Sequence, residues 1–309
     1  MTPAALDRRA LLGAMAALPL LTLPACAGAR PPAPDAAAAL AALEKRAGGR
    51  LGVAILDGKD GTLTGHRTGE RFTMCSTFKF SLAAAVLARI DAGKIAPDAT
   101  LPITRDDPVG HSPALRDALD RGETSLPVLM LAQAAQVQSD NGASNILLRR
   151  IGGPAALTGF WRELGDDVSR LDRYEPALNT SHDGDPRDTT SPTAMAGSMR
   201  RILTGERLKA ESRDRLIGWM IDTRTGLKRL RGGFPADWRA GDKTGTNPGD
   251  GSYAGKVNDL AVVWHPARPD PFFITALYET VKGTETRPQD EAVLAEAGKI
   301  AAAWIAARI

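Results

Sequence analysis

Apolar residues gather in short runs at both ends of the chain. Residues 51–56 form one run, and a turn at Asp57-Gly58 separates it from a second strand over residues 62–66. Near the other end, residues 260–264 and 272–278 form two apolar runs with prolines between them. Short apolar runs bounded by turn residues are typical of buried strands, so the pattern predicts a β-hairpin at each end.

The other apolar positions predict helices. Asp35 precedes a helix that ends at Gly48-Gly49, and a helix from about residue 290 to 309 closes the chain. Two more helices are expected at 81–90 and 126–138. This order indicates an α+β fold, in which strands from both chain ends form one antiparallel sheet flanked by the terminal helices. An all-helical part would pack beside the sheet, with the active site between them.

Size and composition fit one globular domain. We expect it to span residues 30–309, with an α/β part over about 35–70 and 220–309 and a helical part over about 71–219. The chain has 309 residues, of which 43% are hydrophobic and 24% charged, as in ordinary globular proteins. The chain has 39 basic and 36 acidic residues, and this net charge is too balanced to indicate a nucleic-acid partner.

The first residues resemble an export signal. Asp7-Arg8-Arg9 is followed by an uncharged stretch over 10–29, which predicts a signal peptide over residues 1–29. The alternative is a membrane-spanning helix, but glycine and prolines interrupt the stretch. Arg8-Arg9 resembles a twin-arginine signal, and Leu23-Pro24-Ala25-Cys26 resembles a lipoprotein box. We therefore expect an exported, periplasmic protein with no stable membrane span, and lipid attachment at Cys26 stays open.

Cysteine and histidine usage argues against disulfides and metals. Once the leader is removed, Cys75 is the one remaining cysteine, so we expect it to be a small buried residue without a disulfide. The four histidines, at positions 66, 111, 182 and 265, show no pair with metal-ligand spacing. No metal or other cofactor is expected.

Ser76 and Lys79 form the first candidate for chemistry. Residues three apart share a face of a helix, so Lys79 can reach the Ser76 hydroxyl. A serine becomes a good nucleophile only when a base removes its proton, and a buried lysine can be that base. At a helix start the Ser76 N–H also points toward a developing anion.

Three further motifs follow in the chain. They are Ser139-Asp140-Asn141, the segment 173–179 around Glu175 and Asn179, and Lys243-Thr244-Gly245. Each alone also reads as an ordinary turn, loop corner or strand end. Their order after an export signal is what indicates a shared function.

In these motifs the sequence resembles the class A serine β-lactamases, over nearly the whole chain from about Asp35. Asn145 fits the same pattern. So does the segment 173–188, which in that family is an Ω-loop closed by an ion pair, here between Arg173 and Asp188.

The resemblance implies a role for each residue in acylation and deacylation. Ser76 would attack the lactam carbonyl, and the N–H groups of Ser76 and Thr246 would form the oxyanion hole. Ser139 would pass a proton to the lactam nitrogen, near Lys79 and Lys243. Glu175, helped by Asn179, would activate the water that hydrolyses the ester. Whether Lys79 or Glu175 deprotonates Ser76 stays open.

The resemblance also implies a substrate-binding set. Lys243, Thr244 and Thr246 would bind the substrate carboxylate, and Arg229 matches an arginine that supports this site in some members; the alternative for Arg229 is a solvated surface arginine. The other residues expected at the substrate are Asn141, Asn179, Gly245 and His111.

Three positions depart from the commonest family patterns. His111 stands where many relatives place an aromatic residue at the site entrance. Asn247 stands where some carbapenem-hydrolysing relatives place a cysteine that bonds to the counterpart of Cys75, so that disulfide cannot form here. The segment 246–257 is longer than expected, and its Pro248–Gly251 run predicts a mobile flap on the site rim.

The expected function is hydrolysis of penicillins and cephalosporins through a serine acyl-enzyme, which confers antibiotic resistance. A penicillin-binding DD-peptidase or transpeptidase would share the serine and lysine motifs, but Glu175 with Asn179 favours the hydrolase. A non-catalytic penicillin sensor would need a signalling segment. The expected partner is a small β-lactam molecule, and we expect a monomer.

Overall fold

The computed structural model describes Met1, residues 35–180, His182 and residues 184–309. The chain divides into two units, Met1–Pro32 and Ala33–Ile309, and the fold is that of the second unit. Apart from Met1, the predicted signal peptide, with Cys26, lies outside the described residues.

Strands from both chain ends form one antiparallel sheet, as the sequence predicts. The sheet has five strands in the order β2-β1-β9-β8-β7. The central strand β9 pairs with β1 on one side and with β8 on the other, so that Ala276 lies opposite both Val53 and Asp259. The strand bounds are β1 Arg50–Asp57, β2 Leu63–His66, β7 Arg239–Asn247, β8 Lys256–Trp264 and β9 Phe272–Glu279.

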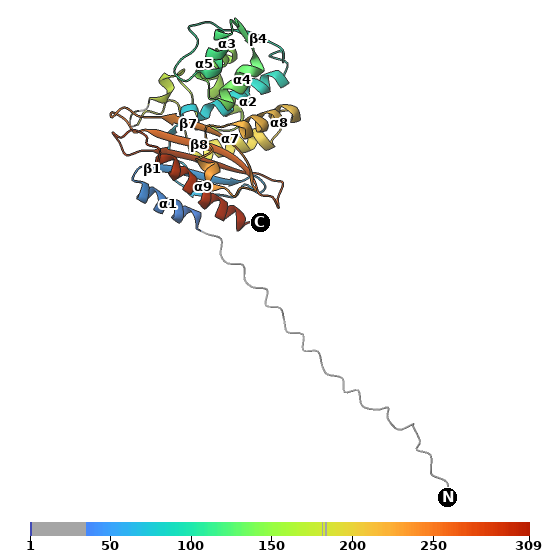
Figure 1. The fold of residues 1–309 in the computed structure, drawn as a ribbon, viewed down its shortest axis with the longest axis vertical. Coiled ribbons are helices and arrows are strands. Elements are labelled where there is room, and N and C mark those ends of the chain that lie inside the picture. Colours follow the sequence, from blue (N-terminus) through green and yellow to red (C-terminus); the bar gives the residue numbers. More distant parts are fainter. Residues whose placement is uncertain (2–34, 181, 183) are drawn as a thin grey trace. The chain divides into compact units, whose positions relative to one another are not determined.

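The two terminal helices cover one face of this sheet (Figure 1). Helix α1 spans Ala36–Ala47; the Asp35 side chain caps its start, and Gly48 ends it at a φ of 79°. Helix α9 spans Asp290–Ala306. Their apolar sides and the sheet enclose a core that includes Leu40, Ile274 and Trp304.

Helix α7 and the helical part lie on the other face. Helix α7, Pro192–Thr204, packs against β1 and β9, although it falls within the segment 71–219 that we expected to be the all-helical part. Helix α2, Phe78–Asp91, is buried on every side as far as Ala88, which marks it as the centre of the helical part. The remaining helices are α3 Pro113–Asp120, α4 Val128–Val137, α5 Asn141–Ile151, α6 Pro154–Glu163 and α8 Ala210–Asp222.

Some boundaries differ from the prediction. The helix expected from residue 126 begins at Val128, because Ser125–Pro127 (β5) pairs with Thr100–Pro102 (β4). Strand β8 begins four residues before the apolar run, since its polar first half is also buried. In the part of the chain that the structure describes, no helix is long and apolar enough to cross a bilayer.

Candidate active site

Ser76 lies in a tight turn between the sheet and the central helix. It is the middle residue of a 3₁₀ turn, η1 (Cys75–Thr77), directly before α2. Cys75 has a φ of 47°, a left-handed conformation that is strained for a residue with a side chain. The Met74 N–H donates to the Asp188 carbonyl at 3.0 Å, and the Thr77 hydroxyl donates to the Met74 carbonyl at 2.8 Å. Neighbouring contacts therefore fix the turn. Cys75 is buried, as predicted, and its thiol is free.

Lys79 follows one helical turn later, and its side chain is fully buried. Its Nζ lies 2.9 Å from Ser76 Oγ, 3.1 Å from Glu175 Oε1 and 2.5 Å from Asn141 Oδ1. Burial lowers the pKa of Lys79, and the negative charge of Glu175 opposes that shift. Lys79 can therefore exchange a proton with the Ser76 hydroxyl.

Ser139-Asp140-Asn141 forms the junction between α4 and α5. Ser139 has a φ of 59°, and the Asp140 carboxylate caps α5 by accepting the Ala143 N–H at 2.8 Å. Ser139 Oγ lies 3.0 Å from Lys243 Nζ and 3.5 Å from Lys79 Nζ. The Ser139 hydroxyl thus bridges two lysines.

Glu175 reaches the same point from the segment predicted as an Ω-loop. Its Oε1 lies 3.4 Å from Ser76 Oγ, and its Oε2 accepts Asn179 Nδ2 at 2.5 Å. The predicted ion pair is present: Arg173 Nε lies 2.5 Å from Asp188 Oδ2. Asp188 is fully buried and also accepts the main-chain N–H groups of Asp172 and Arg173.

Strand β7 brings Lys243, Thr244, Gly245 and Thr246 alongside the Ser76 turn. A Cβ at Gly245 would lie 2.7 Å from the Met74 carbonyl, so the strand can approach this closely only with glycine there. Burial, together with the charge of Lys79, lowers the pKa of Lys243 well below its ordinary value.

Arg229 is buried behind this strand rather than solvated. Its Nη1 donates to the carbonyls of Gly245 at 3.1 Å and Asn258 at 2.8 Å, and its Nη2 donates to Thr246 Oγ1 at 2.7 Å. Arg229 Nε pairs with Glu291 at 3.1 Å. Arg229 therefore supports the strand edge on which Thr246 lies.

His111 and Asn247 lie at the edges of the group. His111 Nε2 is 2.9 Å from the Gln138 carbonyl, and the His111 carbonyl accepts the Asn141 N–H at 2.8 Å. Asn247 Nδ2 donates to the Asn179 carbonyl at 2.7 Å, which ties the end of β7 to the segment that carries Glu175. In the sequence, Asn247 marks only the absence of a cysteine, and no local pattern indicates this bond.

The predicted flap is anchored to neighbouring segments. After Asn247, the Pro248 carbonyl accepts the Thr286 N–H at 2.8 Å, and the Gly255 N–H donates to the Thr284 carbonyl at 3.1 Å. The Tyr253 ring packs edge-on against His182, with centroids 6.1 Å apart. Residues 248–255 therefore connect the chain that follows β9 with the Ω-loop.

Asn258 is a second residue that the sequence analysis missed. It is buried in β8 and hydrogen-bonds to the chain just before Ser76. The available signal was a pair of polar residues, Asn258 and Asp259, directly before an apolar strand run.

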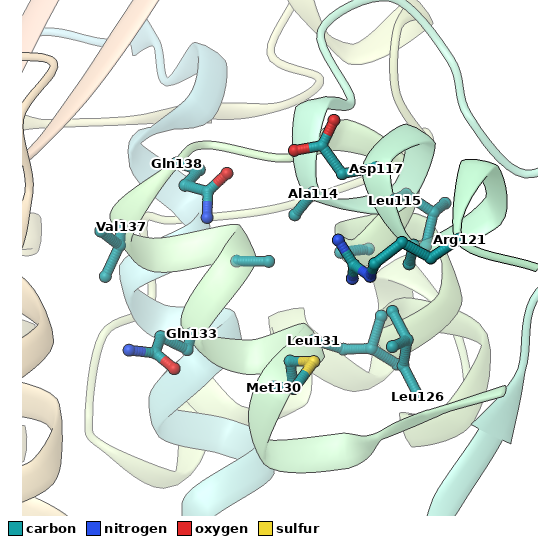
Figure 2. A pocket seen from close by; sticks show the side chains of 13 residues that line it. Ala114, Leu115, Asp117, Arg121, Leu126, Met130, Leu131, Gln133, Val137 and Gln138 are labelled. Atoms are coloured by element: carbon teal, nitrogen blue, oxygen red, sulfur yellow. The ribbon is translucent and has the colours of Figure 1, made fainter. Parts of the chain in front are cut away.

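One cavity of about 260 Å³ lies apart from this group, between α3, α4 and α5. Figure 2 shows that leucines and Met130 line much of it, while Arg121 and Gln138 supply polar groups. Across residues 35–180, 182 and 184–309, no three histidine, cysteine, aspartate or glutamate side chains gather as a metal site would require.

Comparison with known proteins gives one consistent result. The model of the beta-lactamase enzyme family matches residues 35–305. Beta-lactamase L2 of Stenotrophomonas maltophilia is 43% identical over 92% of this chain and 92% of its own. Beta-lactamase Toho-1 of Escherichia coli is 39% identical over 95% of this chain and 96% of its own.

Solved structures agree. A beta lactamase from Xanthomonas campestris pv. campestris superposes with a TM-score of 0.81 at 41% identity, covering 87% of this chain and 97% of that one. An ancestral class A beta-lactamase superposes with a TM-score of 0.79 at 48% identity, covering 86% and 98%.

Proposed function

The chain belongs to the class A serine β-lactamases and hydrolyses the β-lactam ring, and we propose that Ser76 is the nucleophile of this reaction. The observation that carries the proposal is the convergence on Ser76 Oγ of Lys79 Nζ at 2.9 Å and Glu175 Oε1 at 3.4 Å. Either group is near enough to accept the hydroxyl proton, and the choice between them stays open.

Acylation opens the ring by addition to the lactam carbonyl followed by elimination of the lactam nitrogen. Ser76 Oγ bonds to the lactam carbonyl carbon, and the N–H groups of Ser76 and Thr246 stabilise the oxyanion. The carbon–nitrogen bond then breaks, and the nitrogen takes a proton from Ser139. The position of Ser139 Oγ between Lys243 and Lys79 supports this role, because either lysine can resupply the proton.

Deacylation needs a base that stays free to activate water while Ser76 carries the acyl group. Glu175 accepts a proton from water as the water oxygen attacks the ester carbon. The bond between that carbon and Ser76 Oγ then breaks, and the proton passes from Glu175 to the leaving Ser76 oxygen. The bond from Asn179 to Glu175 Oε2 supports this assignment, since it orients the carboxylate and leaves Oε1 toward Ser76. This second step separates a hydrolase from a penicillin-binding protein, which stays acylated.

Substrate recognition uses the carboxylate next to the lactam. Lys243, Thr244 and Thr246 bind it, and Arg229 acts through Thr246 from behind. Asn141, Gly245 and His111 complete the binding surface, and the substrates are penicillins and cephalosporins. The enzyme works as a monomer without a cofactor.

Residues 1–29 direct export to the periplasm, and Arg8-Arg9 fits the twin-arginine route. The mass of the mature protein distinguishes simple cleavage from a lipid on Cys26.

The experiment that tests the enzymatic proposal is turnover of a chromogenic cephalosporin by the purified chain. We expect many turnovers per molecule, and Ser76→Ala should show neither turnover nor a penicilloyl adduct by mass spectrometry. An adduct on that variant would remove Ser76 from its role.

A further inference from the structure

One buried amide beside the site takes no part in the proposed mechanism. Asn258 lies in β8 with 1% of its surface exposed. Its Nδ2 donates to the carbonyls of Thr73 at 2.8 Å and Met74 at 3.1 Å, and its Oδ1 accepts the Tyr278 N–H at 3.2 Å. The side chain therefore ties two strands of the sheet to a third segment.

That third segment leads directly into the Ser76 turn. The Met74 carbonyl also accepts the Thr77 hydroxyl at 2.8 Å, so it is held from both sides of the turn. Cys75, which lies between Met74 and Thr77 in the chain, has the strained φ of 47°. A strained residue persists only where its surroundings over-determine the backbone, and the Asn258 amide is part of those surroundings.

The same residue also reaches the other side of the site. The Asn258 carbonyl accepts Arg229 Nη1 at 2.8 Å, and Arg229 Nη2 donates to Thr246 Oγ1 at 2.7 Å. Asn258 thus contacts the chain before Ser76 with its side chain and the support of Thr246 with its main chain.

We propose that Asn258 is a positioning residue that sets the spacing between the Ser76 and Thr246 N–H groups. The inference rests on the proposed oxyanion hole formed by those two groups. Such donors stabilise the transition state only when they are aimed at the developing oxyanion. A shift of the Ser76 turn would therefore weaken transition-state binding more than substrate binding.

Asn258→Asp tests this with little change of shape, because it removes both Nδ2 donors. We expect kcat/KM for penicillin to fall about tenfold to hundredfold, as misplacement by roughly 1 Å can cost. The affinity for a boronic acid, which forms a tetrahedral adduct on Ser76, should fall by a similar factor. Activity relative to the parent should recover toward acidic pH, because a protonated carboxyl regains one donor.

Asn258→Ala provides a second variant without a buried charge, and both are measured on the folded fraction, counted by melting curves and by burst titration. The matched control is Thr275→Val on β9, because the buried Thr275 hydroxyl has no hydrogen-bond partner among the residues that the structure describes. It should leave kcat/KM and boronic acid affinity at the parent values.

The proposal fails if both Asn258 variants melt earlier but keep kcat/KM and boronic acid affinity within about twofold of the parent, since that marks a purely structural role. Failure of the proposed mechanism has a different signature. In that case Ser76→Ala of the otherwise unchanged chain would still form the adduct.

Discussion

Asn145 and Glu175 are joined by two reciprocal hydrogen bonds between the side-chain amide of one and the main chain of the other. Asn145 Nδ2 donates to the Glu175 carbonyl at 2.9 Å, and the Glu175 N–H donates to Asn145 Oδ1 at 3.0 Å. Asn145 belongs to α5, the helix that starts at Asn141. The position of the Glu175 carboxylate is therefore set by the helical part rather than by the loop alone.

Glu175→Gln should separate the two chemical steps. Glutamine keeps the size of the side chain but cannot accept the proton of water. Positioned general-base catalysis is worth about 10²–10⁴ in rate, so hydrolysis of the acyl-enzyme should fall by at least that factor. A stoichiometric burst should precede slow turnover, with a stable adduct on Ser76 visible by mass spectrometry.

Glu296→Gln on the exposed side of α9 is the matched control and should behave as the parent. Near-normal turnover of Glu175→Gln without a burst would show that Glu175 is not the deacylation base.

Asp188→Ala should destabilise the protein strongly. The substitution leaves the buried end of Arg173 without its partner and removes the acceptor of two main-chain N–H groups. Breaking a buried pair costs about 3–5 kcal/mol of unfolding free energy, measurable by urea denaturation.

The same loop supplies the control, Asp185→Ala. Its partner Arg187 lies on the surface at 2.7 Å, where solvent screens the pair, so stability should change little. Equal losses in the two variants would mean that the Arg173–Asp188 pair does not close the loop.

Arg229→Ala should weaken catalysis with both penicillins and cephalosporins. The arginine supports Thr246 and the Gly245 carbonyl from a buried position. Losing one charge-assisted contact costs about 1.5–3 kcal/mol, roughly a tenfold to hundredfold fall in kcat/KM. Arg224→Ala, at an exposed site five positions earlier in the chain, controls for the loss of charge. Unchanged kinetics in Arg229→Ala would assign this arginine to the scaffold alone.

Lys243→Met should lower activity and raise stability. Burial and the charge of Lys79 depress the pKa of Lys243, so the folded chain binds fewer protons than the unfolded chain at pH values between the depressed pKa and the ordinary lysine pKa. The parent therefore gains stability as the pH rises from the depressed pKa toward the ordinary one, whereas methionine does not titrate.

The melting temperature of Lys243→Met should exceed that of the parent most at low pH, and the difference should shrink as the pH rises. Its kcat/KM should fall about tenfold to hundredfold through loss of a charge-assisted contact. Lys299→Met, at an exposed site on α9, should follow the parent at every pH. Parallel curves for Lys243→Met and the parent would refute the burial argument.

Local patterns in the sequence were enough to predict the antiparallel sheet and to locate the motifs that form the candidate site. The apolar runs of β1 and β9 mark buried strands wherever they occur, and the Ser76–Lys79 spacing places both side chains on one face. The Arg173–Asp188 pair also followed, because the family resemblance spans the whole loop.

Contacts between residues far apart in the sequence could not be predicted from local patterns. Nothing near Arg229 in the sequence indicates that it is buried behind β7, since its partners lie 16 to 62 positions away. Asn258 bonds to Thr73 across 185 positions, so its importance depends on how the two chain ends meet. The start of α4 was misplaced for a similar reason, because β4 captures the residues before it.

Cys75 gives the turn that carries Ser76 an intrinsic chemical reporter. Burial raises the pKa of this thiol to about 12, so at neutral pH almost none of it is thiolate. An alkylating reagent can then react only in moments when the turn separates from β7 and β8. The alkylation rate would measure how often the nucleophile leaves its working position, and comparison with the rate of global unfolding would distinguish a local opening from loss of the whole fold.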